Sequence, residues 1–174
     1  MRTHLRLLVA LLAATISVSA VSAETKLPSI FTNNMVLQRE APIPFWGWDK
    51  PGNKVTVSIG EASQSAEADK EGRWMVKLPA MKAGGPHTVK VVGSSTHSYK
   101  NVLVGEVWLC SGQSNMEWRV SQSKDAKKEI ASANHPMIRH IKYPHQTSTK
   151  PETNNRSQGG WQVCSPKTVA SFTA

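Results

Sequence analysis

The feature of this sequence that most constrains its fold is a series of short apolar runs, each closed by turn residues, between positions 27 and 104. Each run has the length of a strand, about 4 to 8 residues, and is too short for a helix with a buried face. Glycine and proline separate the runs, because glycine adopts positive φ and proline fixes a bend. The predicted strands are Met35–Leu37, Pro44–Trp48, Lys54–Ile59, Arg73–Leu78, His87–Val92 and Ser98–Val104.

Alternation within the runs predicts two packed layers. Val55, Val57 and Ile59 share one face of their run, and polar residues occupy the other face. This pattern is expected when one side of a strand packs on a core and the other side meets water. Two sheets packed face to face bury such residues economically, so residues 24–104 are predicted to form a β-sandwich.

From Gly105 onward the pattern changes to that of an α/β domain. The run Glu106–Cys110 is apolar enough to be a strand covered on both faces, as in a parallel sheet. A helix is predicted over Lys124–Ala133, with Ser123 as its cap, and Ile138–Tyr143 is predicted to be the next strand. Together these elements would form a right-handed β-α-β unit.

The last residues predict the beginning of a further helix. Ser165-Pro166 has the composition of a helix cap and first turn, and Val169 and Phe172 begin an apolar face. One β-α-β unit and part of a helix cannot cover both faces of a sheet, so residues 105–174 are predicted to be an incomplete domain. The polar segment 144–160 is either a loop beside a site or a flexible linker.

Ser114 is the candidate nucleophile. It follows the apolar run and a glycine, in Ser111-Gly112-Gln113-Ser114. A turn at this point would lift its hydroxyl from the carboxyl edge of the sheet, where the sites of open α/β sheets form. A backbone amide at the same turn could donate a hydrogen bond to a developing oxyanion.

Several sequence blocks, including the one around Ser114, resemble sialate O-acetylesterases, a carbohydrate-esterase branch of the SGNH (GDSL-like) hydrolases. The resemblance extends over essentially the whole chain after residue 23. The blocks are Phe31–Arg39, Pro44–Gly47, Gly105–Trp108, Trp108–Trp118 and Trp161–Pro166.

The resemblance implies a mixed fold, in which a β-sandwich precedes a flavodoxin-like SGNH catalytic domain. It also implies removal of O-acetyl groups from sialic acid or other acetylated sugars. Ser114 would form an acetyl-enzyme, without a metal or cofactor.

The sequence departs from the family pattern at the catalytic base. The family places this histidine in an Asp-x-x-His element, and no aspartate of this chain is followed by a histidine three residues later. The scattered His135, His140 and His145 are the in-chain alternatives, although the expected explanation is an inactive or incomplete fragment. A second interpretation is a non-catalytic exported β-sandwich that binds glycan or a protein partner.

The first residues resemble an export signal. Arg2 and Arg6 precede an apolar run, and small residues follow near position 23, so residues 1–23 are predicted to be a signal peptide of a periplasmic or extracellular protein. After cleavage no stable membrane anchor is expected. Loss of Arg2 and Arg6 with the signal peptide would lower the formal net charge from +9 to about +7. The remaining basic residues are spread along the chain and do not form the clustered patch that nucleic-acid binding requires.

The sequence contains two cysteines, Cys110 and Cys164. An exported chain permits a disulfide between them, but each ends an apolar run, where free buried thiols are also common. No Cys or His pair has zinc-ligand spacing, so no metal is expected. The oligomeric state stays open.

Overall fold

The computed structural model of the chain describes residues 24–154, 156–157 and 159–173. The predicted signal peptide, residues 1–23, lies outside the described residues. The strands are β1 Val36–Gln38, β2 Ile43–Trp48, β3 Lys54–Ile59, β4 Ala62–Glu67, β5 Arg73–Leu78, β6 Gly84–Val92, β7 Thr96–Gly105, β8 His135–His140 and β9 Gln162–Cys164. The helical elements are α1 Ala126–Ser132 and the 3-10 turns η1 Ser114–Glu117, η2 Val120–Gln122 and η3 Val169–Ser171. Within these ranges no helix is long and apolar enough to cross a membrane.

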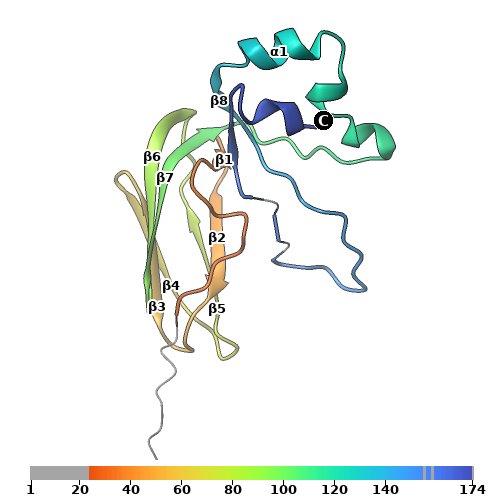
Figure 1. Ribbon diagram of the computed structural model, residues 1–174. Helices are drawn as coiled ribbons and strands as arrows, with labels where there is room; N and C mark the ends of the chain where they lie inside the picture. The colour runs from red at the N-terminus through yellow and green to blue at the C-terminus, as the bar shows by residue number, and fades with distance from the viewer. Residues whose placement is uncertain (1–23, 155, 158, 174) are drawn as a thin grey trace, which may run out of the picture.

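Strands β1 to β7 form two sheets that enclose one core, within a mixed, sheet-rich fold (Figure 1). A curled five-stranded sheet has the order β1-β7-β6-β3-β4, and β2 pairs with β5 opposite it. All pairs are antiparallel except the parallel pair β1–β7. The predicted strands of this region are all present, and the sequence missed β4 because this edge strand is polar and mostly exposed.

The core lies between these two sheets and follows the alternation of the strands. Val55, Val57 and Ile59 are at most 1% exposed. Phe45 is fully buried and stacks on Phe31 at 4.7 Å between ring centroids. Trp74, which is 3% exposed, belongs to the same core.

The predicted β-α-β unit is wrong. Residues 106–110 form no strand, because the described chain offers them no neighbouring strand to pair with. The strand predicted at Ile138–Tyr143 is instead β8, which starts at His135 since the residue before a proline favours extended backbone. Strand β8 pairs antiparallel with β9, so the described residues after Gly105 contain no parallel pair.

The two predicted helix starts also differ from the structure. Helix α1 begins after Asp125, which has left-handed φ, and not after a Ser123 cap. The predicted last helix is the single turn η3, because Phe172 returns to extended backbone and its carbonyl accepts a hydrogen bond from the Val120 amide at 3.0 Å. Cys164 is buried beside this turn, whereas Cys110 is exposed, and both thiols are free.

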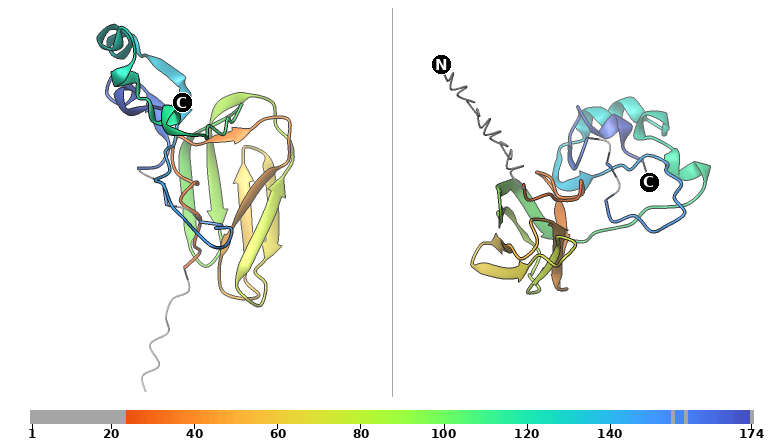
Figure 2. Two further views of the ribbon diagram at one scale, coloured as in Figure 1. Left: turned by 90° about the vertical axis from the view of Figure 1, so that its right-hand side faces the viewer. Right: turned by 90° about the horizontal axis from the view of Figure 1, so that it is seen from below.

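The described residues of segment 144–160 return to the sheets and connect the two parts of the chain (Figure 2). Trp161 carries the connection: its Nε1 donates to the Ile30 carbonyl at 2.9 Å, and its amide donates to Thr32 Oγ1 at 3.1 Å. The Trp46 Nε1 donates to the Thr153 carbonyl at 3.3 Å. The end of the segment is therefore an anchored loop and not a free linker.

Replacing Trp161 with alanine is expected to release residues 106–173 from the sheets. The change removes a hydrogen bond and the packing of a half-buried indole on the core, which together contribute about 2 kcal/mol. Limited trypsin digestion should cut faster after Arg156, which is followed by a serine, while a resistant core within 24–104 persists. The exposed Trp118 supplies the control, since Trp118→Ala should leave the digestion pattern unchanged. Equal digestion of both variants would contradict this anchoring role.

Candidate active site

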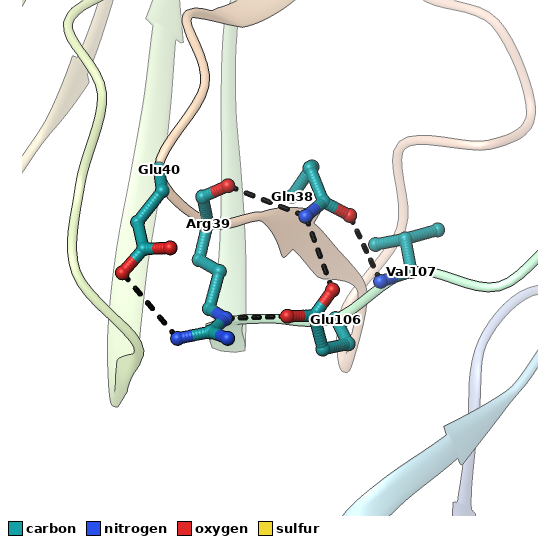
Figure 3. Close-up of polar contacts among 5 residues, drawn as sticks. All are labelled: Gln38, Arg39, Glu40, Glu106 and Val107. Carbon is teal, nitrogen blue, oxygen red and sulfur yellow. Dashed lines mark hydrogen bonds and ion pairs between the residues drawn. The ribbon is translucent and has the colours of Figure 1, made fainter.

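A polar cluster at the end of β7 fixes the direction in which the chain leaves the sheet (Figure 3). Arg39 Nε donates to Glu106 Oε1 at 2.6 Å, and Gln38 Nε2 donates to Glu106 Oε2 at 3.3 Å. Gln38 Oε1 also accepts the Val107 amide at 3.0 Å. The hydrogen bond from Arg39, followed by that from Gln38, lowers the pKa of Glu106. Glu106 therefore stays ionised and holds the start of the segment that leads to Ser114.

The segment after this cluster exposes large apolar side chains. Trp108 is 82% exposed and Leu109 is 94% exposed. Trp118, Met137 and Ile138 are also more than half exposed. Contiguous exposed apolar side chains of this size mark surfaces that another polypeptide or ligand covers. We refer to Val107, Trp108 and Leu109 as the apolar strip.

Ser114 is the first residue of η1, and no residue of this turn is buried. The turn is closed by the Met116 amide, which donates to the Gln113 carbonyl at 2.9 Å. A Cβ on Gly112 would lie 2.8 Å from the Met116 side chain, so glycine permits the tight approach. Ser114 thus lies on a solvent-exposed turn, although this turn does not follow a buried strand as predicted. Among the described residues its hydroxyl has no hydrogen-bond partner.

Titratable groups gather beside Ser114 through Glu117. A 3-10 helix has three residues per turn, so Ser114 and Glu117 lie on the same face of η1. Glu117 Oε1 is 3.3 Å from His145 Nε2 and 3.9 Å from Lys142 Nζ. His145, one of the three histidines considered as a base, thus contacts η1, but it contacts Glu117 and not the Ser114 hydroxyl.

A pocket of about 220 Å³ adjoins this group of charges. It is lined by Arg119, His140, Lys142, Gly160, Gln162 and Ser171. His140 stacks on Phe172 at 4.4 Å, and burial, followed by the charge of Lys142, lowers the pKa of His140. Sequence reasoning missed this pocket because its walls come from η2, β8, β9 and η3, which are far apart in the sequence. Lys142 belongs both to the pocket and to the cluster around Glu117.

The described residues do not assemble a metal site. Within residues 24–154, 156–157 and 159–173, no group of three His, Cys, Asp or Glu side chains is placed to hold a metal ion.

Comparison with known proteins shows which enzymes the chain resembles. No family model matches it. It is 38% identical to the sialate O-acetylesterase of Mus musculus over 115 residues, which is 59% of this chain and 21% of the mouse protein. It is also 38% identical to the sialate O-acetylesterase of Homo sapiens over 117 residues, 60% of this chain and 22% of the human protein.

Among solved structures, the fold matches the crystal structure of a carbohydrate acetylesterase from Xanthomonas citri with a TM-score of 0.83 at 38% identity. This match covers 87% of the chain and 35% of the Xanthomonas protein. The resemblance to sialate O-acetylesterases that the sequence motifs predict is confirmed. The matched regions amount to about a fifth of the length of the mouse and human relatives.

Proposed function

We propose that this chain carries the nucleophile of a carbohydrate esterase that removes O-acetyl groups from sialic acid or other acetylated sugars. The observation that carries the proposal is the exposed Ser114 on η1, within a chain similar to enzymes named as acetylesterases. These similarities do not favour the alternative of a non-catalytic binding module. The predicted signal peptide, residues 1–23, implies that the protein is exported, so we propose that this activity is periplasmic or extracellular.

The proposed reaction uses two acyl-transfer steps. Ser114 Oγ attacks the acetyl carbonyl while a base accepts the hydroxyl proton, and the tetrahedral intermediate expels the sugar oxygen, which takes up a proton. The acetyl group is then bonded to Ser114. Water attacks this ester, releases acetate and restores the serine, and neither step consumes a cofactor.

The base is proposed to come from residues that this chain does not contain. A serine hydroxyl is weakly nucleophilic unless a base accepts its proton, and the Ser114 hydroxyl has no partner among the described residues. The family's Asp-x-x-His element is absent from the sequence. The relatives are several times longer than the segments matched here, so a longer product or a companion polypeptide is the proposed source.

The same missing part would complete the fold. We interpret residues 24–104 as a β-sandwich and residues 105–174 as the start of an SGNH-type domain. The apolar strip has the composition of a central strand but lies exposed with no ladder partner in the described chain. Strands supplied by the missing part would cover Trp108 and Leu109 and hold η1 at the edge of a sheet.

A chimera tests this proposed function. Residues 24–174 are fused to the part of the Xanthomonas citri carbohydrate acetylesterase that follows its matched region. We expect the chimera to hydrolyse 4-nitrophenyl acetate and to release acetate from O-acetylated sialic acid, while the isolated chain shows no rate above buffer. The parent Xanthomonas enzyme is the positive control.

Two results would contradict the proposal. The first is a folded chimera that is inactive on acetyl esters which the parent enzyme cleaves. The second is steady-state hydrolysis by the isolated chain that Ser114→Ala removes, because this would place the base within the chain.

A further inference from the structure

We propose that the pocket of Arg119, His140, Lys142, Gln162 and Ser171 binds the carboxylate of an acidic sugar. This inference rests on the proposed function and assigns the charged end of the substrate to a place in the structure. It also names Arg119 as the residue that distinguishes acidic from neutral acetylated sugars.

The pocket is built by contacts that fix its walls relative to one another. His140 on β8 is the register partner of Gln162 on β9, so the two side chains are held on neighbouring strands. Arg119 precedes η2 and forms a β-bridge with Thr173, next to Ser171 at the end of η3. The Val120 amide donates to the Phe172 carbonyl at 3.0 Å, which ties the η2 and η3 walls together.

The charge of the lining favours an anion. Arg119 and Lys142 are cationic, and none of the described residues that line the pocket carries a carboxylate. Arg119 has no acidic partner in the described part of the chain. His140 is neutral near pH 7 because burial and Lys142 lower its pKa. It therefore offers hydrogen bonds, as do the Gln162 amide and the Ser171 hydroxyl.

The charge balance favours a monoanion over a phosphate dianion. Glu117 lies 3.9 Å from Lys142 Nζ and offsets part of its charge, which leaves Arg119 as the unopposed cation. A guanidinium matches a planar carboxylate with two parallel hydrogen bonds. The neutral side chains of Gln162 and Ser171 suit the hydroxyl groups that accompany the carboxylate on a sugar.

The size and position of the pocket suit one end of such a substrate. Its volume of about 220 Å³ is below the ~300–1,000 Å³ of whole-ligand sites. It therefore takes the charged end of a sugar and leaves the rest outside. Lys142 connects the pocket to Glu117 on η1, the turn that begins with Ser114. An ester elsewhere on the same sugar would thus lie on the side of the nucleophile.

Binding to the chain tests this inference without requiring catalysis. The probes are N-acetylneuraminate, its methyl ester and inorganic phosphate, titrated against the ¹⁵N-labelled chain. We expect N-acetylneuraminate to shift the amide signals of Gln162 and Ser171, and the methyl ester to bind about tenfold more weakly or worse, since it lacks the charge. Arg119→Gln should weaken binding of the acid by about tenfold, whereas Lys127→Gln on the exposed face of α1 should not.

A second variant keeps the inference testable if Arg119→Gln does not fold. If Arg119→Gln loses its dispersed spectrum, Lys142→Gln is used and is expected to weaken binding of the acid severalfold. Equal binding of the acid and its methyl ester would overturn the inference. Undiminished binding by a folded Arg119→Gln, tighter binding of phosphate, or no saturable binding of the acid would do the same.

The results of this binding test and of the chimera test can be told apart. An inactive chimera together with acid-selective binding that depends on Arg119 would contradict the proposed esterase function and support the carboxylate site. An active chimera that binds the acid and its methyl ester equally well would contradict the carboxylate site and leave the esterase function supported.

Discussion

Replacing Ser114 with alanine in the chimera is expected to lower kcat for 4-nitrophenyl acetate by about 10⁴-fold or more, with little change in KM. The hydroxyl oxygen forms the covalent bond of the acetyl-enzyme, so its removal eliminates the pathway and leaves only stabilisation of direct water attack. Because Ser114 is exposed and makes no hydrogen bond within the described residues, its removal should leave the unfolding midpoint unchanged.

The matched controls are neighbouring serines on the same exposed segments. Ser111→Ala and Ser121→Ala remove hydroxyls before η1 and within η2, and both should retain nearly full kcat. Mass spectrometry of the quenched reaction should find an acetyl group on the peptide containing Ser114 and none in the Ser114→Ala variant. If Ser114→Ala kept the rate of the controls, or if the acetyl group lay on another residue, Ser114 would not be the nucleophile.

The strands of the two sheets could be predicted because their signal is local. Val55, Val57 and Ile59 alternate with polar residues, and this period of two is enough to place β3. Strand β4 escaped detection because an exposed edge strand has no apolar face to reveal it. Propensity and turn residues define such a strand poorly, and only its pairing with β3 makes it visible.

The segment after Gly105 could not be predicted in the same way. The apolar strip has the composition of a buried strand, but a strand forms only where another strand satisfies its backbone groups. Within the described chain no such neighbour exists, and the segment is exposed. Composition therefore predicted a buried strand that the described chain does not form.

The same difference between local and long-range signals applies to the candidate site. Ser114 could be proposed as the nucleophile because Ser111-Gly112-Gln113-Ser114 belongs to a continuous block that resembles a known family. The pocket beside it could not, because Arg119 and Lys142 are unremarkable surface cations until β8, β9 and η3 bring them to one place. The contact between Glu117 Oε1 and His145 Nε2 joins η1 to the segment after β8, and no spacing rule indicates it.

Removing the carboxylate of Asp49 is expected to destabilise the two sheets and to make their stability less dependent on pH. Asp49 is 8% exposed and accepts hydrogen bonds from Thr25 Oγ1 at 2.6 Å, the Ser94 amide at 3.0 Å and the Lys50 amide at 2.7 Å. The Ser94 hydroxyl and Asn53 Nδ2 donate to it as well. Asp49 therefore ties together the start of the described chain and the turns after β2 and β6.

These contacts determine the direction of the pH effect. Burial alone would raise the pKa of Asp49, but the hydrogen bonds donated by Ser94, Thr25 and Lys50 outweigh it and hold the pKa well below its ordinary value of 3.8. A carboxyl whose pKa is lower in the folded state stabilises the fold fully above the unfolded pKa. This contribution is lost as the pH falls below about 3.8 toward the folded pKa.

Asp49→Ala is expected to lower the free energy of unfolding at pH 7 by about 2 to 4 kcal/mol, because the buried Thr25 hydroxyl and the partly buried donors of Ser94 and Lys50 lose their acceptor. Urea titrations at pH 7 and at steps between about pH 5 and 2 measure both effects. The wild-type chain should lose stability over this range, and the variant should lose less. Asp125→Asn is the control, since Asp125 is exposed and its side chain caps no helix amide. An unchanged free energy of unfolding at pH 7, or the same acid dependence in Asp49→Ala as in the wild type, would show that this carboxylate does not hold the turns together.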